Sequence, residues 1–327
     1  MRRTHGFLTT VLFVLVGCTH EASQPKGTSL PKFNPPPQRI NARHLPNAYR
    51  IHERVISGGE PDSEAAFQQL IALGVKTVIS VDGARPQVDL ARKYGLRYVH
   101  LPHGYDGVPK ERARELTKAV RDLPGPIYIH CHHGKHRSPT AAAIACVGVG
   151  LLRPEEAVSV LHIVGTSENY QGLYESAKKA RRFDDALLNA LTMKFLERMD
   201  VPPMVEAMTS IEHTHDNLKA IQQAGWKPPT DHPDLDPPHE SLLLREHFTE
   251  LLRTEAAHQQ PSRFQDILLA SQTAAAELEA DLRSWPDPRQ PAPEVITNSF
   301  ARITNYCKAC HSQFRNVPLN EKQKRKP

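Results

Sequence analysis

The sequence predicts two regions of different fold class, an α/β region up to about residue 182 and an all-helical region from residue 183 onward. Before residue 183, short runs rich in β-branched residues alternate with segments of helical periodicity. After it, the strand-like runs disappear and the helical segments become long. Proline-rich breaks separate these long segments, and the 327 residues exceed the usual size of one domain.

The α/β region contains two apolar runs that are typical of buried parallel strands, at residues 75–81 and 127–130. Helical periodicity covers residues 62–73 and 110–123, and residues 61–64 (PDSE) suit the start of the first helix. Strands that alternate with helices form a sheet covered by helices. We therefore predict a parallel-type central sheet flanked by helices.

The helical region contains five predicted helices, at residues 185–199, 203–224, 239–257, 261–284 and 293–314. The breaks between them are short and rich in proline. Helices joined by short connections pack as antiparallel neighbours, so the sequence predicts an α-helical bundle over residues 183–320. A basic tail follows at residues 321–327.

The first 17 residues predict a signal peptide. Arg2 and Arg3 precede a short apolar run at residues 7–16, which is too short to span a bilayer as a stable helix. The run ends in LVGC at residues 15–18, which resembles the bacterial lipobox. This resemblance implies that Cys18 carries lipid and that the protein is exported and anchored to a bacterial membrane, facing the periplasm. An ordinary signal peptide or a chance apolar run remains the alternative.

Residues 18–45 are polar and rich in proline, which predicts an extended tether. The net charge of +5 comes largely from residues 178–182 and 322–326, and such runs are usually solvated surface. We therefore expect no nucleic-acid binding. The five cysteines are not spaced as a disulfide framework, and Cys146, in an Ala/Val/Ile-rich run, is predicted to be a buried small hydrophobic residue.

Residues 130–138, HCHHGKHRS, carry the predicted catalytic chemistry. A strand precedes them and a helix at residues 139–149 follows, so backbone N–H groups of the loop would converge on an anion. The positive electrostatic potential of these N–H groups and of the helix N-terminus favours the thiolate form of Cys131, the predicted nucleophile. Arg137 offers a planar pair of donors to phosphate oxygens, and Ser138 is placed to hydrogen-bond the thiolate. We predict that His132, His133, Gly134, Lys135 and His136 bind the substrate.

With these motifs, about residues 46–180 resemble the dual-specificity-type protein tyrosine phosphatases, and we predict a phosphatase domain over residues 46–182. The resemblance implies a phosphocysteine intermediate, no cofactor, and a carboxylic acid on a separate loop. Asp106 is the candidate, 25 residues before Cys131. Asp82 is its rival, and Asp106 in its Asp-Gly pair could instead only form a turn. An inactive phosphate-binding relative and a rhodanese-type sulfurtransferase are the alternatives to phosphatase activity.

The basic residues of the loop favour polyanionic substrates such as inositol phosphates over isolated phosphotyrosine. A general phosphatase of phosphoproteins or small phosphoesters is the alternative. Adjacent histidines can also ligate metals, although His132, His133 and His136 more simply make the loop electropositive.

Cys307, Cys310 and His311 form the CxxCH pattern of c-type haem attachment. Placed in the last predicted helix, the motif resembles that of the cytochrome c-prime family. This resemblance implies covalent haem c with His311 as the proximal iron ligand, and an electron-transfer partner. Met193 is the candidate sixth ligand, in competition with Met199, Met204, Met208, His213 and His215. A zinc site, a redox dithiol and a disulfide are the alternatives to haem.

Together these motifs predict a lipid-anchored phosphatase with a haem domain. The alternative is a haem-based redox or gas sensor, or an electron carrier, whose phosphatase region serves as an output or as a phosphate-binding module.

Overall fold

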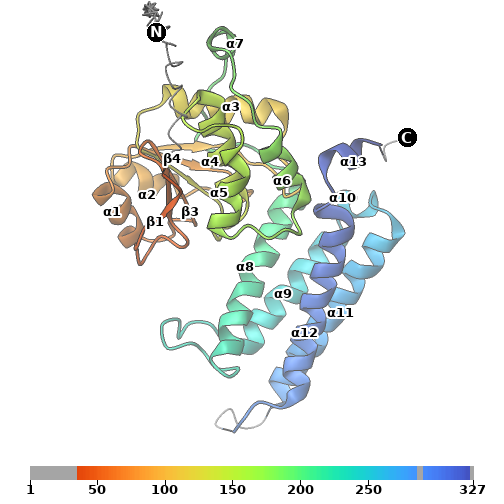
Figure 1. Cartoon of the computed structure of the whole chain (residues 1–327). Coiled ribbons are helices and arrows are strands. Elements are labelled where there is room, and N and C mark those ends of the chain that lie inside the picture. The colour runs from red at the N-terminus through yellow and green to blue at the C-terminus, as the bar shows by residue number, and fades with distance from the viewer. Residues whose placement is uncertain (1–34, 286–289, 325–327) are drawn as a thin grey trace, which may run out of the picture. The chain divides into compact units, whose positions relative to one another are not determined.

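The computed structural model describes residues 35–285 and 290–324 (Figure 1). The predicted signal peptide, the lipidation site Cys18 and most of the tether lie outside the described residues, as do residues 325–327. Residues from Pro35 onward form one compact unit. Within it the α/β region has two hydrophobic cores and the helical region has a third, and the boundary at 182/183 stays a prediction.

The α/β region is built on a six-stranded mixed sheet in the order β1-β2-β3-β6-β4-β5. Neighbours β3, β6, β4 and β5 are parallel, whereas β1 and β2 add an antiparallel edge to the predicted parallel arrangement. The strands are β1 (Gln38–Arg39), β2 (Tyr49–His52), β3 (Val55–Gly58), β4 (Thr77–Ser80), β5 (Arg97–His100) and β6 (Ile127–His130).

The antiparallel edge corrects the predicted tether. Gln38 and Arg39 pair with β2, and Leu45 is buried in the core. The chain therefore joins the fold before residue 45, because its backbone groups satisfy the edge of β2 and its apolar side chains cover the sheet.

Helices cover both faces of the sheet, as its alternating buried side chains require. Tyr128 of β6 packs in one core with α1 and α2, and Ile127 and Ile129 pack in the other with α3 to α6. The helices are α1 (Glu64–Ala72), α2 (Val88–Lys93), α3 (Lys110–Asp122), α4 (Arg137–Val149), α5 (Glu156–Val164) and α6 (Gln171–Lys178). Cys146 is fully buried in α4, as predicted, and burial raises the pKa of its thiol to about 12.

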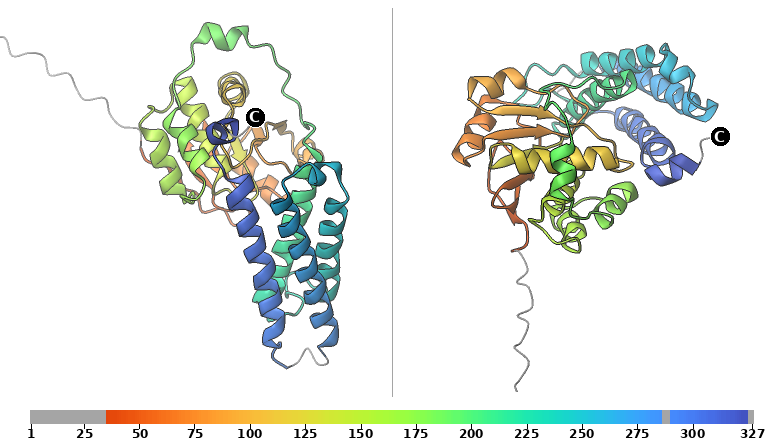
Figure 2. Two further views of the ribbon diagram at one scale, coloured as in Figure 1. Left: turned by 90° about the vertical axis from the view of Figure 1, so that its right-hand side faces the viewer. Right: turned by 90° about the horizontal axis from the view of Figure 1, so that it is seen from above.

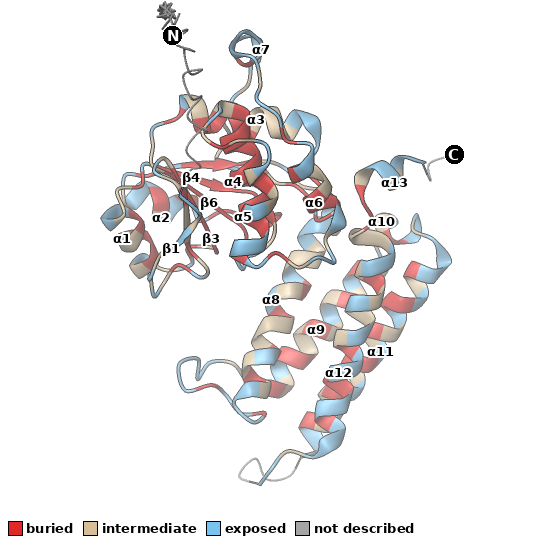
Figure 3. Cartoon of the chain, viewed as in Figure 1, coloured by how far each residue is buried: buried red, intermediate tan, exposed pale blue. Residues whose placement is uncertain are grey.

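The C-terminal region is helical, and α8, α9, α11 and α12 lie side by side (Figures 1 and 2). They share a core that includes Leu218, Leu244, Leu278 and Ile303. Figure 3 shows buried and exposed positions alternating along these helices. Among the described residues, no helix is both long and apolar enough to cross a membrane. The elements are α7 (Asp185–Ala190), α8 (Pro203–Gln223), α9 (Pro237–Leu252), α10 (Glu255–His258), α11 (Ser262–Ser284), α12 (Glu294–Cys310), a π-helix (His311–Arg315) and α13 (Leu319–Lys324).

The prediction of a helix over residues 185–199 was wrong beyond Ala190. The following segment lies along β5, the edge strand of the sheet. The backbone N–H of His100 donates to the Leu196 carbonyl at 2.8 Å, and the Met199 N–H donates to His100 Nδ1 at 3.0 Å. These tertiary partners replace the hydrogen bonds that a helix would have provided.

Candidate active site

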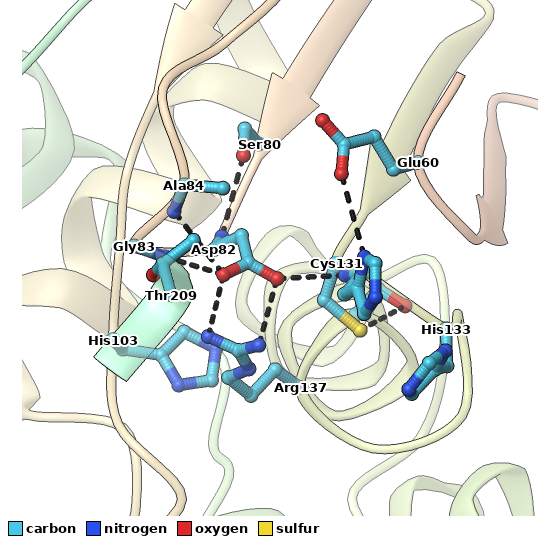
Figure 4. A network of polar contacts seen from close by, with 12 residues as sticks. Glu60, Ser80, Asp82, Gly83, Ala84, His103, Cys131, His133, Arg137 and Thr209 are labelled. Atoms are coloured by element: carbon cyan, nitrogen blue, oxygen red, sulfur yellow. Dashed lines mark hydrogen bonds and ion pairs between the residues drawn. The ribbon is translucent and has the colours of Figure 1, made fainter. Parts of the chain in front are cut away.

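The predicted phosphate loop connects the end of β6 to the start of α4, so the helix N-terminus faces the loop (Figure 4). Its backbone carbonyls are bonded outward. The His132 carbonyl accepts a hydrogen bond from the Glu60 N–H at 3.0 Å, and the Gly134 carbonyl accepts one from Asn47 Nδ2 at 3.0 Å. The Lys135 carbonyl accepts one from Thr166 Oγ1 at 2.7 Å. Among described residues, no acceptor engages the N–H groups of residues 133–136. These donors therefore remain for an anion.

Gly134 is required by the close approach of this loop to the end of β3. Its φ of +72° lies in the left-handed region, and a Cβ there would stand 2.4 Å from the backbone nitrogen of Gly59. No larger side chain fits without moving the loop. The turn that orients the loop thus depends on a glycine at this position.

Cys131 is buried beneath the loop, 2% exposed. Its thiol donates to Ser138 Oγ at 3.4 Å, and the Ser138 hydroxyl donates to the Gly58 carbonyl at 3.1 Å. When Cys131 is ionised, the Ser138 hydroxyl can turn to donate to Sγ. The role predicted for Ser138 is therefore compatible with its position.

Arg137 is also buried, and Asp82 holds it (Figure 4). Its Nη1 and Nη2 donate to the two carboxylate oxygens of Asp82 at 3.0 and 2.7 Å. The backbone N–H groups of His132, Gly83 and Ala84 also donate to this carboxylate. Burial alone would raise the pKa of Asp82, but the Arg137 guanidinium and these N–H groups hold it well below its usual range.

This pairing leaves one pair of N–H donors of Arg137 available to a substrate. Arg137 Nε is buried and has no hydrogen-bond partner within the described part of the chain. Because a guanidinium has two donor pairs, Nε–H and the second Nη2–H can bind two phosphate oxygens while Asp82 occupies the other pair. Asp82 is an ionised positioning residue, and its geometry does not suit the rival role of proton donor. Its place at the carboxyl end of β4, beside β6, is the signal that could have indicated this role.

The loop that carries Asp106 lies against the phosphate loop through its neighbour Tyr105. The guanidinium of Arg137 lies 4.4 Å from the centre of the Tyr105 ring, and Tyr170 packs on the same ring at 4.8 Å between centroids. Burial raises the pKa of Tyr105, so its hydroxyl stays neutral. The structure thus brings Tyr105, Tyr170 and Arg137 together, and sequence reasoning did not identify the two tyrosines.

Asp106 is held by the C-terminal end of the described chain. Lys322 of α13 contacts the Asp106 carboxylate at 2.9 Å, and the Leu319 N–H donates to the Asp106 carbonyl at 2.9 Å. A Cβ at Gly172, in α6, would lie 1.9 Å from that carbonyl oxygen, so glycine permits this close packing. The basic tail is therefore not only solvated surface, because Lys322 pairs with the candidate acid.

The histidines of the loop do not form the uniformly electropositive lining that we predicted. Hydrogen bonds to Asp216 and Glu60 raise the pKa of His132 to about 10. Burial, together with nearby positive charge, lowers the pKa of His136 to about 4, and burial also lowers the pKa of His133. At neutral pH, His132 is thus the charged imidazole of the three, and its charge faces carboxylates.

The CxxCH motif ends α12. Within the described residues Cys307 and Cys310 are free thiols, one helical turn apart, and both pack against the core of the helical region. Burial lowers the pKa of His311 to about 3, so the imidazole is neutral.

Met193 is not brought together with this motif. It packs against the core of the α/β region, as does Met199, because the segment after Ala190 lies along the sheet. Of the competing residues, Met204 and Met208 pack on the helical core. His215 donates to or accepts from Thr304 Oγ1 at 3.0 Å.

No known family profile matches the chain, and no curated protein resembles it in sequence. The chain is similar to several solved structures, some of which are described as phosphatases. P. aeruginosa TpbA is 22% identical, with 46% of this chain and 92% of that chain covered and a TM-score of 0.38. The catalytic core of the S. cerevisiae PP-IP phosphatase SIW14, in complex with citrate, is 15% identical (48% and 92% covered, TM-score 0.36). PTPMT1 in complex with PI(5)P is 20% identical (40% and 92% covered, TM-score 0.35). Each similarity covers less than half of this chain.

Proposed function

We propose that the chain is a cysteine-dependent phosphatase of the dual-specificity type, which hydrolyses phosphoesters through a phosphocysteine intermediate. The observation that carries the proposal is the buried Cys131 beneath a loop of unengaged N–H groups, beside an Arg137 that Asp82 holds with one pair of N–H donors unoccupied. A tetrahedral dianion would find donors on several sides of this site.

The reaction has two steps. The Cys131 thiolate forms a bond to phosphorus as the bond to the leaving oxygen breaks. Asp106, protonated and no longer paired with Lys322, gives that oxygen its proton. Water then attacks phosphorus, Asp106 takes back a proton, and inorganic phosphate leaves with the thiolate restored. Trapping with an aryl phosphate, rapid denaturation and mass spectrometry should find the phosphoryl group on Cys131. Its absence while turnover continues would argue against this intermediate.

For substrate preference, the positive charge that the loop offers a bound phosphate comes from Arg137 and the exposed Lys135. His133 and His136 are neutral, and the charge of His132 faces carboxylates. We expect Lys135 to favour polyanions such as inositol polyphosphates over phosphotyrosine. Lys135→Ala should lower kcat/KM for an inositol polyphosphate about tenfold or more, as expected for loss of a hydrogen bond between charged groups.

The measurement compares kcat/KM for the inositol polyphosphate with that for a phosphotyrosine peptide. Lys227→Ala, which removes an exposed lysine far along the chain from the loop, is the matched control. A ratio of the two constants that Lys135→Ala leaves unchanged would remove this basis for polyanion preference.

We also propose that the C-terminal region is a haem-binding helical bundle, in which Cys307 and Cys310 would attach haem c and His311 would bind its iron. The two free thiols on one helix face and the adjacent neutral imidazole fit this donor set. When bound, the group would supply reversible one-electron chemistry or gas binding. Export to the periplasm, as the predicted lipoprotein signal implies, would bring the chain to where such attachment occurs.

One observation favours the alternative function, in which the haem domain senses and the phosphatase responds. Directly after the motif, Arg315 lies 4.2 Å from the Tyr105 ring centre, and Lys322 pairs with Asp106. The segment that follows His311 thus contacts the loop that carries Asp106, the proposed proton donor.

The visible spectrum tests for haem. Protein produced with the haem-attachment machinery should keep a c-type absorption spectrum after denaturation and solvent extraction, because the thioethers are covalent. Cys307→Ser/Cys310→Ser should lose it. A wild-type protein that keeps no covalent haem would refute the proposal, and the phosphatase proposal would stand independently.

A further inference from the structure

A group of histidines and carboxylates lies where the phosphate loop meets helix α8. His132 and His133 come from the loop, Glu60 follows β3, and His213 and Asp216 come from α8. Figure 4 shows Glu60 and His133 beside the loop. Helix α8 packs closely on the α/β region here, because a Cβ at Gly83 would lie 2.2 Å from a Val205 methyl group.

Three ligand atoms of this group converge. His132 Nε2 lies 3.0 Å and His133 Nε2 lies 3.6 Å from the same oxygen of Asp216, Oδ2. All three ligand atoms lie within 4.8 Å of one another. Two ligand atoms that are each about 2.0–2.1 Å from a tetrahedral zinc ion are about 3.3 Å apart, so the observed separations lie on both sides of that value.

The other nitrogen of His132 has the partner that metal-bound imidazoles usually have. His132 Nδ1 lies 3.5 Å from the carboxylate of Glu60, whose side chain is only 12% exposed. A carboxylate on Nδ1 fixes the tautomer that presents Nε2 to a metal. The His213 ring stacks on His132 with 5.1 Å between centroids and restrains its plane.

The environment also admits an ion. His133 is 46% exposed, so the group opens to solvent. Lys219 pairs with Asp216 through the other oxygen, Oδ1, at 3.3 Å, which leaves Oδ2 directed at the two histidines. Two imidazoles and a carboxylate suit zinc better than magnesium, which prefers oxygen ligands.

We propose that His132, His133 and Asp216 bind a zinc ion, with Glu60 orienting His132 and a fourth position open to water or an anion. The site would join α8 to the phosphate loop one residue after Cys131. It stands on the geometry of these side chains and does not depend on the proposed phosphatase activity or on haem.

Zinc binding to the full chain is measured by isothermal titration calorimetry at about pH 8, where zinc has to displace the proton that Asp216 and Glu60 hold on His132. Cys18, Cys131, Cys307 and Cys310 are replaced by serine in all proteins, since thiolates would bind zinc independently, and the fully buried Cys146 is kept. The parent should bind one zinc ion in the micromolar range or tighter. Asp216→Asn and His133→Ala should each weaken binding at least tenfold, and Glu60→Gln should weaken it about 10- to 100-fold.

Glu206→Gln, an exposed carboxylate change on the same helix, is the matched control and should bind zinc as the parent does. His133→Ala is the second test variant because its side chain is half exposed, so this protein should fold even where Asp216→Asn does not. Zinc should also raise the thermal midpoint of the parent and of Glu206→Gln but not of Asp216→Asn. No saturable binding by the parent, or equal affinity in the parent, Asp216→Asn and His133→Ala, would overturn the proposal and leave an ordinary hydrogen-bonded cluster.

Discussion

Cys131→Ser should reduce turnover of an aryl phosphate to the background rate while the protein stays folded. A serine hydroxyl is not ionised near neutral pH, so the nucleophile is lost although the side-chain shape is nearly kept. The new hydroxyl can still hydrogen-bond Ser138, because Cys131 Sγ lies 3.4 Å from Ser138 Oγ. The measurement is the initial rate, with circular dichroism and thermal unfolding to establish that the fold is retained.

Cys146→Ser is the matched control. Cys146 is equally buried but lies within α4, packed among apolar side chains. A hydroxyl there affects folding stability and not the chemistry, so folded Cys146→Ser should keep its activity. Arg137→Lys should lose most activity. The guanidinium has one pair of N–H donors for Asp82 and a second pair for a phosphate, whereas an ammonium cannot make both two-point contacts. Turnover retained by Cys131→Ser would contradict the mechanism.

The parts of the site that are contiguous in sequence could be predicted. Strand, loop and helix follow one another within residues 127–149, so local pattern and the Cys131–Arg137 spacing sufficed. The contacts that position this loop come from far along the chain. Asp82 precedes Arg137 by 55 residues, and Lys322 follows Asp106 by 216. Nothing local in the sequence indicates such pairings.

The same distinction explains the fold predictions. Helices α3 and α11 have long apolar periodicity, and their existence was predicted with nearly correct bounds. The segment after Ala190 also has helical periodicity, but the edge of β5 offers its backbone other partners. The beginning of the fold was missed because residues 38–39 are too short a strand to recognise without the β2 strand that they pair with.

Asp106→Asn should lower kcat/KM by about 10²–10⁴, the usual range for loss of one general acid. The loss should be largest for substrates with poor leaving groups, such as alkyl phosphates, because their oxygen must be protonated as it leaves. It should shrink for aryl phosphates whose phenolate leaves without a proton. The measurement is a plot of log kcat/KM against leaving-group pKa for wild type and variant, because hydrolysis of the phosphocysteine is the same for every substrate and affects kcat alone. The slope should steepen in Asp106→Asn.

Asp82→Asn separates the two carboxylates. It removes the buried partner of Arg137, which costs about 3–5 kcal/mol of stability when a buried ion pair is broken, and it lets the phosphate clamp move. Its activity should therefore fall by a similar factor for all leaving groups. Lys322→Ala releases Asp106 without removing it, so that variant should keep the wild-type slope. If Asp82→Asn steepened the slope and Asp106→Asn did not, the proton donor would be Asp82, and the Arg137 pair would have to open during turnover to free it.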